Sequence, residues 1–263
     1  MAQSFDRPAP TLPRRGVSWV IARIHYLLLL LVGAILMLVI GIPIIYISKM
    51  VRTLFGIEDF VYPLARIGVR IFVAASGARV DISGLDNIDP AKTYVFVANH
   101  QSNLDPPILF AWLPHNVGGI AKKELEKIPF FRQGFSVAHI VSIDRKNRES
   151  AIESTRRGAE ELRNGHSLIA FPEGTRSADG QLKEFKKGIF FMAIEARVPI
   201  VPIAFNDTGR VMPKHGALLI PGRVSVEVLP PIDTRDFPVA RIEEIVSRTK
   251  EAIASRVRVE TIN

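Results

Sequence analysis

Two side chains suited to acid–base chemistry follow an apolar run in the stretch VFVANHQSNLDPPIL, residues 95–109. His100 follows the run after Asn99, and Asp105 immediately precedes the pair of prolines that predicts a helix start. A tight loop could bring the carboxylate to one imidazole nitrogen, which would fix the tautomer and leave the other nitrogen as a general base. The spacing alone also allows a purely structural role, in which Asp105 caps the helix and His100 satisfies backbone groups.

A second polar segment has the residue types that bind anions. The stretch FPEGTRS, residues 171–177, follows an apolar run, and its proline and glycine predict a turn. Gly174 and Thr175 can present backbone N–H groups to an anion, and the guanidinium of Arg176 can contact two phosphate oxygens at once. Arg145 also follows an apolar run. One loop arginine is usually only solvated, but two at separate strand ends predict a phosphate-binding site.

Short aliphatic and β-branched runs alternate with amphipathic segments from residue 79 onward, which predicts an α/β fold. We expect a mixed, largely parallel sheet flanked by helices. The predicted strands are 79–82, 93–98, 117–121, 139–143, 167–171, 199–205 and 223–229. The predicted helices are 105–113, 149–164, 183–196 and 240–257. Active groups in this fold class gather beyond the carboxyl ends of the strands, so His100, Arg145 and Arg176 are expected at one edge.

The N-terminal part of the chain contains a segment suited to a membrane. Tyr26–Ser48 comprises 23 residues without a charge. A helix of that length reaches about 30 Å, enough to cross the hydrocarbon core. Pro43 is expected to kink this helix, which membrane helices tolerate. A cleaved signal peptide fits less well, because the apolar run is long and no small-residue cleavage site precedes Lys49.

Residues 60–77 predict a second, amphipathic helix. Its apolar stripe consists of Phe60, Leu64, Ile67, Ile71 and Ala74, with Arg66 and Arg70 at the flank. It is either an interfacial helix whose arginines reach lipid headgroups or an ordinary packed helix. We therefore expect N-terminal membrane-anchoring helices over residues 1–77 and a catalytic domain over residues 78–263. Whether the anchor spans the membrane or lies in one leaflet is left open by the sequence.

The composition excludes several classes of protein. A hydrophobic content of 48% with 23% charged residues indicates a folded chain. The absence of cysteine excludes disulfides and cysteine-ligated metals, and it fits a catalytic domain on the cytoplasmic side of a membrane. Of the net charge of +8, eight basic and three acidic residues give +5 in residues 1–70, leaving +3 for residues 71–263. This distribution favours membrane lipids over nucleic acid as partner.

These segments, in this order, resemble the glycerolipid acyltransferase family, specifically the 1-acylglycerol-3-phosphate acyltransferases. The segments are NHQSNLD with its His-x4-Asp spacing, IVSIDR, FPEGTRS and VPIVPIAF, and AKKELEKIPFF looks like the family's stretch between the first two. A lone His-x4-Asp is a weak signal, whereas four segments in order between residues 95 and 205 are specific. The resemblance favours the catalytic interpretation of His100 and Asp105 over the structural one.

The resemblance implies transfer of a fatty acyl group from an acyl thioester to the sn-2 hydroxyl of 1-acylglycerol-3-phosphate, giving phosphatidic acid. The donor would be acyl-CoA or acyl carrier protein, and no metal, cofactor or acyl-enzyme is implied. His100 would be the general base, oriented by Asp105, and residues 198–205 would support the pocket or an acyl-chain channel. Glu173 would organise its loop or orient the acceptor. The residues implied in substrate binding are Lys122, Arg145, Glu173, Gly174, Thr175 and Arg176.

Two departures from the family pattern leave the acceptor open. The family commonly has glycine where this chain has Arg132 and His139, and these residues could alter the pocket wall or the acceptor headgroup. Alternative acceptors are a lyso-ornithine lipid and lysophosphatidylglycerol. A membrane-bound hydrolase is another alternative, although GHSLI, residues 165–169, lacks the second glycine of a nucleophile elbow. A non-catalytic membrane scaffold would not need the His/Asp pair. The other histidines, His25, His115, His166 and His215, are expected to be structural or on the surface.

Overall fold

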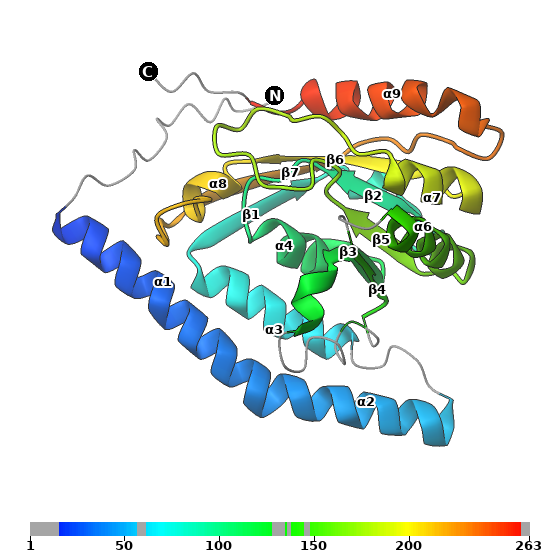
Figure 1. Cartoon of the computed structure of the whole chain (residues 1–263). Coiled ribbons are helices and arrows are strands. Elements are labelled where there is room, and N and C mark those ends of the chain that lie inside the picture. Colours follow the sequence, from blue (N-terminus) through cyan, green and yellow to red (C-terminus); the bar gives the residue numbers. More distant parts are fainter. Residues whose placement is uncertain (1–15, 57–61, 128–134, 136–137, 145–147, 259–263) are drawn as a thin grey trace.

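The computed structural model describes residues 16–56, 62–127, 135, 138–144 and 148–258 of the chain (Figure 1). These residues contain one sheet of seven strands in the order β1-β7-β6-β2-β5-β3-β4. The strands are β1 (Ala78–Ser83), β2 (Val95–Ala98), β3 (Val117–Lys122), β4 (Ile140–Ile143), β5 (Ser167–Ala170), β6 (Ile200–Asn206) and β7 (Gly222–Val228). β6 and β7 pair antiparallel, and every other neighbouring pair of described strands is parallel. The predicted mixed, largely parallel sheet is confirmed.

Helices cover both faces of this sheet. The described helices are α1 (Val17–Leu36), α2 (Ile42–Phe55), α3 (Tyr62–Ala75), α4 (Asp105–Trp112), α6 (Arg148–Arg163), α7 (Gly188–Ala196), α8 (Thr208–Val211) and α9 (Ile242–Ala254). One face packs against α3 and α4, and the other packs against α6, α7 and α9 (Figure 1). In β2, Phe96 and Ala98 face the first layer while Val95 and Val97 face the second. A strand buried on both faces is apolar at every position, which explains the run before His100.

All seven predicted strands are present, each within two residues of its predicted bounds. The helix predicted over residues 183–196 is wrong in its first turn, because α7 begins only at Gly188. The backbone N–H of Lys183 donates to the Glu173 carboxylate at 3.2 Å, and that of Lys186 donates to the Pro172 carbonyl at 2.9 Å. These donors bond to the second polar segment instead of forming a helical turn.

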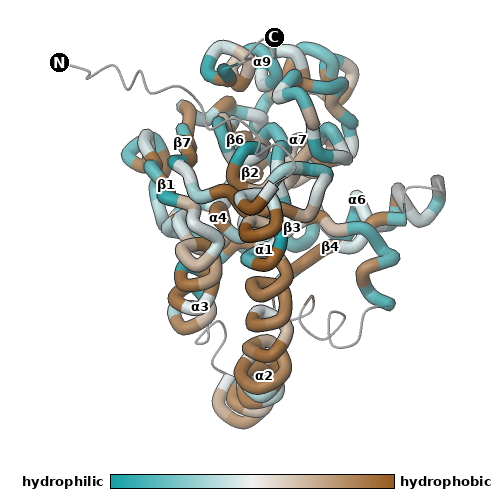
Figure 2. The backbone as a smooth tube through the Cα atoms, turned by 90° about the vertical axis from the view of Figure 1, so that its left-hand side faces the viewer, coloured by the Kyte–Doolittle hydropathy of each residue, from teal (hydrophilic) through white to brown (hydrophobic). Residues whose placement is uncertain are grey.

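The N-terminal apolar segment forms a long helix beside the sheet. Helix α1, a π-helical turn at Met37–Gly41 and helix α2 follow one another without a break over 39 residues, Val17–Phe55. Among the described residues this is the one helix long and apolar enough to cross a membrane. Figure 2 shows it as a hydrophobic rod that extends below the body of the molecule. Pro43 has no N–H to bond to the preceding turn, and the π-helical turn accommodates this at the bend between α1 and α2 (Figure 1).

Helix α3 carries the predicted apolar stripe on its outer side. Leu64, Ile67 and Ile71 are 55%, 55% and 60% exposed, whereas Val73 on the inner side is fully buried in the main core. Phe60 lies outside the described residues. The helix is therefore packed on one side and apolar towards solvent on the other, a combination of the two predicted alternatives. The domain boundary at residue 77 stays a prediction, since α3 belongs to the same core as the sheet.

The arginines of α3 contact protein, as the alternative of a packed helix predicts. Arg70 Nε donates to the carbonyl of Ala111 at 3.0 Å, and its guanidinium lies over the Trp112 ring at 5.5 Å. Arg66 Nη2 donates to the carbonyl of His115. Carbonyl groups at the end of a helix lack intrahelical partners and carry partial negative charge, so cations are stabilising there. The two arginines fasten α3 to the C-terminal end of α4.

We predict that Arg70→Met weakens the attachment of α3 to α4. A charge-assisted hydrogen bond to a partly buried carbonyl contributes about 1.5–3 kcal/mol, and methionine keeps the apolar stem but not the donor. The apparent Tm of the detergent-solubilised chain should fall by several degrees. Lys49→Met, on the exposed side of α2, serves as the matched control. Equal Tm values for the two variants would contradict the proposed contribution of Arg70.

Candidate active site

One oxygen of Asp105 closes the loop between β2 and α4. Oδ2 accepts hydrogen bonds from the backbone N–H groups of Gln101 and Ser102, at 2.7 and 2.8 Å, and from Nδ1 of His100 at 2.8 Å. The Asp105 side chain is completely buried. The predicted capping role is wrong, because α4 begins at Asp105 itself and its start has no side-chain cap. The carboxylate instead turns back towards the loop and reaches the imidazole, as the catalytic interpretation requires.

The same loop is tied to the elements around it. Asn99 follows the last residue of β2 and pairs with both backbone groups of Phe205 in β6: Nδ2 donates to the carbonyl at 3.0 Å, and Oδ1 accepts from the N–H at 2.7 Å. The side-chain amide thus continues the ladder between β2 and β6 beyond the end of the strand. Ser102 Oγ donates to the carbonyl of Met212 at 2.9 Å. These bonds fix the backbone on both sides of His100.

Glu173 joins the two polar loops. Its Oε1 accepts from the backbone N–H of His100 at 2.9 Å, and its Oε2 accepts from that of Lys183 at 3.2 Å. The carbonyl of His100 in turn accepts from the N–H of Ser177 at 2.7 Å. Glu173 is 5% exposed, and burial raises the pKa of its carboxyl although the two N–H groups oppose the shift. This geometry makes Glu173 a brace between the loops.

The imidazole of His100 is held on a flat apolar support. Its ring stacks on Phe171, with ring centroids 4.3 Å apart and an angle of 28° between the planes. Nδ1 is occupied by Asp105, and the side chain remains 17% exposed. His100 also lines a cavity of about 790 Å³. The ring therefore has a fixed orientation and an edge open to a ligand, the arrangement expected of a general base.

The cavity combines an apolar wall with a cationic mouth. Apolar side chains line it from β3, β4, β5 and α7: Val117, Ile120, Ile140, Ile143, Ile169, Ile189 and Met192. Its cationic lining consists of Lys122, Arg176, Lys186 and Lys214, and no carboxylate is among the described lining residues. Opposite charge favours an anionic group at this mouth, and the apolar wall favours a hydrocarbon chain. The cavity volume is in the range typical of small-molecule sites.

The structure brings most of the predicted site residues together. Lys122, Gly174, Thr175 and Arg176 line the cavity beside His100, whereas Arg145 lies outside the described residues. Glu173 supports the loop from behind and is not part of the lining. Residues 198–205 do not line the cavity either. Their link to the site is the bond between Phe205 in β6 and the side chain of Asn99.

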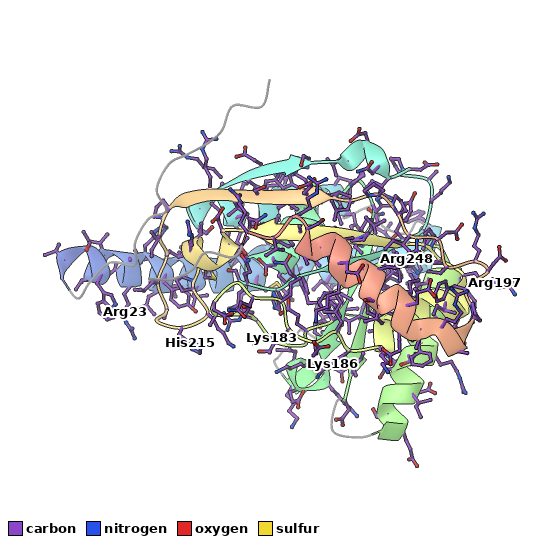
Figure 3. The ribbon with its side chains drawn as sticks, turned by 90° about the horizontal axis from the view of Figure 1, so that it is seen from above. Arg23, Lys183, Lys186, Arg197, His215 and Arg248 are labelled. Carbon is purple, nitrogen blue, oxygen red and sulfur yellow. The ribbon has the colours of Figure 1, made fainter. Side chains whose placement is uncertain are left out.

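Two cations of the lining come from segments that the motifs do not cover. Lys186 follows Lys183 on the segment before α7, where Lys183 Nζ donates to the carbonyl of Arg176 at 3.1 Å (Figure 3). Lys214 reaches the cavity from the loop after α8, and no sequence signal except its position beyond β6 marks it. Cavity-facing lysines on irregular segments cannot be told from solvated ones by sequence alone.

Comparison with known proteins identifies the class. A family model described as "Acyltransferase" matches residues 79–206. The crystal structure of the 1-acyl-sn-glycerophosphate (LPA) acyltransferase PlsC from Thermotoga maritima superposes with a TM-score of 0.76, covering 95% of this chain and 100% of that one at 24% identity. The fold is therefore that of this acyltransferase structure.

Sequence comparison extends the match to named relatives. The 1-acyl-sn-glycerol-3-phosphate acyltransferase of Saccharomyces cerevisiae is 31% identical over 217 residues, which are 81% of this chain and 71% of that one. That of Limnanthes alba is 35% identical over 171 residues, covering 65% and 60%. The human alpha enzyme is 32% identical over 183 residues, covering 69% and 65%. The chain belongs to the 1-acylglycerol-3-phosphate acyltransferase family. It spans about 60% of the length of the Limnanthes relatives.

We predict that Glu173→Gln destabilises the chain by about 1–3 kcal/mol, because the amide can accept from only one of the two N–H groups that Glu173 now binds. Since burial raises the pKa of Glu173 above 4.5, the folded chain binds this proton more tightly than the unfolded chain. This group's contribution to stability therefore falls as the pH rises from 4.5 to the raised value. Glu173→Gln should remove that part of the pH dependence.

Denaturant unfolding of the detergent-solubilised chain across the acidic range measures both effects. Glu184→Gln is the matched control, because Glu184 lies on the same segment but is 95% exposed. If the stability of wild type and Glu173→Gln had the same pH dependence, Glu173 would not be the buried brace described above.

Proposed function

We propose that this chain transfers a fatty acyl group from an acyl thioester to the sn-2 hydroxyl of 1-acylglycerol-3-phosphate, giving phosphatidic acid. The observation that carries the proposal is the 2.8 Å bond from His100 Nδ1 to the buried Asp105 carboxylate, at the mouth of a cavity with cationic and apolar sides. The names of the relatives support the same substrate class. The proposed activity, substrates and partners of this chain all rest on these observations.

In the proposed reaction, His100 Nε2 takes the proton of the acceptor hydroxyl as its oxygen attacks the thioester carbonyl carbon. A tetrahedral intermediate forms, its carbon–sulfur bond breaks, and the imidazolium returns the proton to the departing thiolate. Asp105 accepts the Nδ1 hydrogen throughout, so it sets the tautomer and stabilises the imidazolium. The acyl group passes directly between the substrates, with no acyl-enzyme, metal or cofactor in the reaction.

The proposed acceptor carries both kinds of group that the cavity favours. Its phosphate would be bound by Arg176 and the backbone around Gly174 and Thr175, with Lys122, Lys186 and Lys214 as further cations. We also assign phosphate binding to Arg145, on the basis of the family pattern alone. Guanidinium groups bind phosphate oxygens in pairs, and lysines add charge without fixed geometry. The apolar wall of β3, β4, β5 and α7 would take an acyl chain.

We further propose that α1, α2 and the outer stripe of α3 hold the chain on a membrane, with the catalytic domain on the cytoplasmic side. The exposed apolar surface of these helices and the N-terminal surplus of positive charge support this location. The lysolipid and the product both reside in bilayers. Acyl-CoA and acyl carrier protein both remain possible donors, and both would approach from the aqueous side.

We predict that His100→Ala lowers acyl transfer by about 100-fold or more, since general-base catalysis typically contributes 10²–10⁴-fold. The assay follows free thiol released from a long-chain acyl-CoA by membranes containing the full chain, with lysophosphatidate added or withheld. Wild type should release thiol only when the acceptor is present. His215→Ala, a surface histidine on the loop beside α1, should behave as wild type (Figure 3).

The other outcomes of this assay separate the alternatives. Thiol release without an acceptor would indicate a hydrolase. If no thiol is released from acyl-CoA, acyl carrier protein would be tested as the donor. A preference for lysophosphatidylglycerol or a lyso-ornithine lipid in a competition assay would reassign the acceptor. Near-normal activity of His100→Ala would refute its role as base.

We predict that Arg176→Ala raises KM for lysophosphatidate by about tenfold or more while kcat changes little, because a charge-assisted contact to phosphate is lost. The matched control is Arg248→Ala, on the exposed side of α9 (Figure 3). Uncharged monoacylglycerol, tested as a poor acceptor, should show no such difference between Arg176→Ala and wild type. Unchanged KM for lysophosphatidate would remove Arg176 from the phosphate site.

A further inference from the structure

A cluster of two histidines and a glutamate lies outside the catalytic loops. Nδ1 of His139 and Nδ1 of His166 both contact the same oxygen, Oε2 of Glu161, at 3.0 and 2.8 Å. The two imidazole rings stack with centroids 3.5 Å apart. The side chains of His139, Glu161 and His166 are 11%, 32% and 20% exposed, so the cluster is largely enclosed but reachable from solvent.

The end of α6 places two of these residues. Glu161 lies in the last turn of the helix, and the chain turns back through Gly165, whose φ of 91° is accessible mainly to glycine. The backbone N–H of His166 then donates to the carbonyl of Glu161 at 3.0 Å. The helix terminus therefore holds the His166 ring against the Glu161 carboxylate independently of His139.

A close approach of two strands places His139. Its φ of 50° is in the left-handed region, and its carbonyl would lie 2.2 Å from a Cβ atom at position 118. Only because residue 118 is glycine can β3 come so near to the start of β4. The expectation that His139 alters the pocket wall is not met by its own side chain: Ala138 and Ile140 line the cavity, while the imidazole points to Glu161.

We propose that His139, Glu161 and His166 form a binding site for one divalent transition-metal ion, with Zn²⁺ as the best match. The three ligand atoms already lie within 4.8 Å of one another. Two imidazoles and one carboxylate are a donor set that suits zinc, with water at the remaining position, and are poor ligands for Mg²⁺ or Ca²⁺. The metal would accept the Nδ1 lone pairs of two neutral rings whose protons reside on Nε2.

Metal binding would require the hydrogen-bonded cluster to rearrange. Zinc–ligand distances of about 2.0–2.2 Å place neighbouring ligands about 3.3–3.6 Å apart in a tetrahedron. The two Nδ1 atoms now lie 3.0 and 2.8 Å from Oε2 of Glu161, so these contacts would lengthen. The stacked rings must also rotate about χ2, which is a broad torsion for histidine, so that both planes meet at the ion.

The local charge favours a cation at this point. The cluster contains one carboxylate and sits at the C-terminal end of α6, where the helix macrodipole is negative. On the same helix, Arg163 is engaged by Glu195 at 3.0 Å. A bound metal would join the end of α6, the start of β4 and the start of β5.

The test is equilibrium dialysis of the full chain, purified without a histidine tag and treated with a chelator, against Zn²⁺. We expect one zinc per chain by atomic emission, a rise in Tm that the chelator reverses, and with Co²⁺ a visible d–d band from direct coordination. His139→Gly and His166→Ala should each weaken zinc binding at least tenfold, an effect of the size seen even for residues that only support a ligand. His215→Ala is the matched control and should bind as wild type.

Glu161→Gln covers the case in which a histidine variant does not fold, since it keeps the shape and one acceptor but is a much weaker ligand. It should lose the Co²⁺ band while keeping the circular dichroism of wild type. Failure of wild type to bind stoichiometric zinc would overturn the proposal, as would equal binding by the cluster variants and the His215 control. Because metal binding is measured without substrates, its outcome is independent of the proposed acyl transfer.

Discussion

The geometry of the loop between β2 and α4 depends on three hydrogen bonds to one buried carboxylate oxygen, Oδ2 of Asp105. Two of them come from the backbone N–H groups of Gln101 and Ser102, and the third comes from His100. The same interaction therefore folds the loop and orients the imidazole. A buried carboxylate without such donors would carry a large desolvation cost, so the loop cannot open without exposing or orphaning this charge. One carboxylate oxygen thus holds the backbone of the loop and bonds to the imidazole, although it does not cap α4.

The central strand explains why distant segments meet at this loop. β2 lies between β6 and β5 and is buried on both faces, so its end is surrounded by the loops of its neighbours. Asn99 continues its pairing towards β6, and Glu173, just after β5, bonds to the backbone of His100. Each bond replaces a partner that the backbone loses where the ladder ends. Polar residues at these strand ends thus satisfy the sheet and present the cavity-facing groups together.

Sequence reasoning found the sheet and most helices because these follow local rules of periodicity and turn chemistry, and it found the loop residues from their spacing together with the family resemblance. It failed where tertiary contacts override those rules. The first turn of the predicted helix at residue 183 is lost to bonds with Glu173 and Pro172. For Arg70 the sequence left headgroup contact and packing open, and its bond to a helix end depends on a contact that only the fold creates. Lys214 and the His139 cluster depend on contacts between segments far apart in sequence, which no local pattern encodes.

Helix α4 connects the proposed membrane surface to the proposed base. Its first residue is Asp105, and its last turn and the residues after it accept the bonds of Arg70 and Arg66 from α3. Eight helical residues rise about 12 Å, so the imidazole is held within a short and fixed distance of the exposed stripe on α3. Withdrawing each CH₂ of a lipid chain from the bilayer into water costs about 0.8 kcal/mol. If His100 is the base proposed above, this fixed distance would let the acceptor hydroxyl reach it while most of the acceptor's acyl chain stays in apolar surroundings, either the bilayer or the cavity.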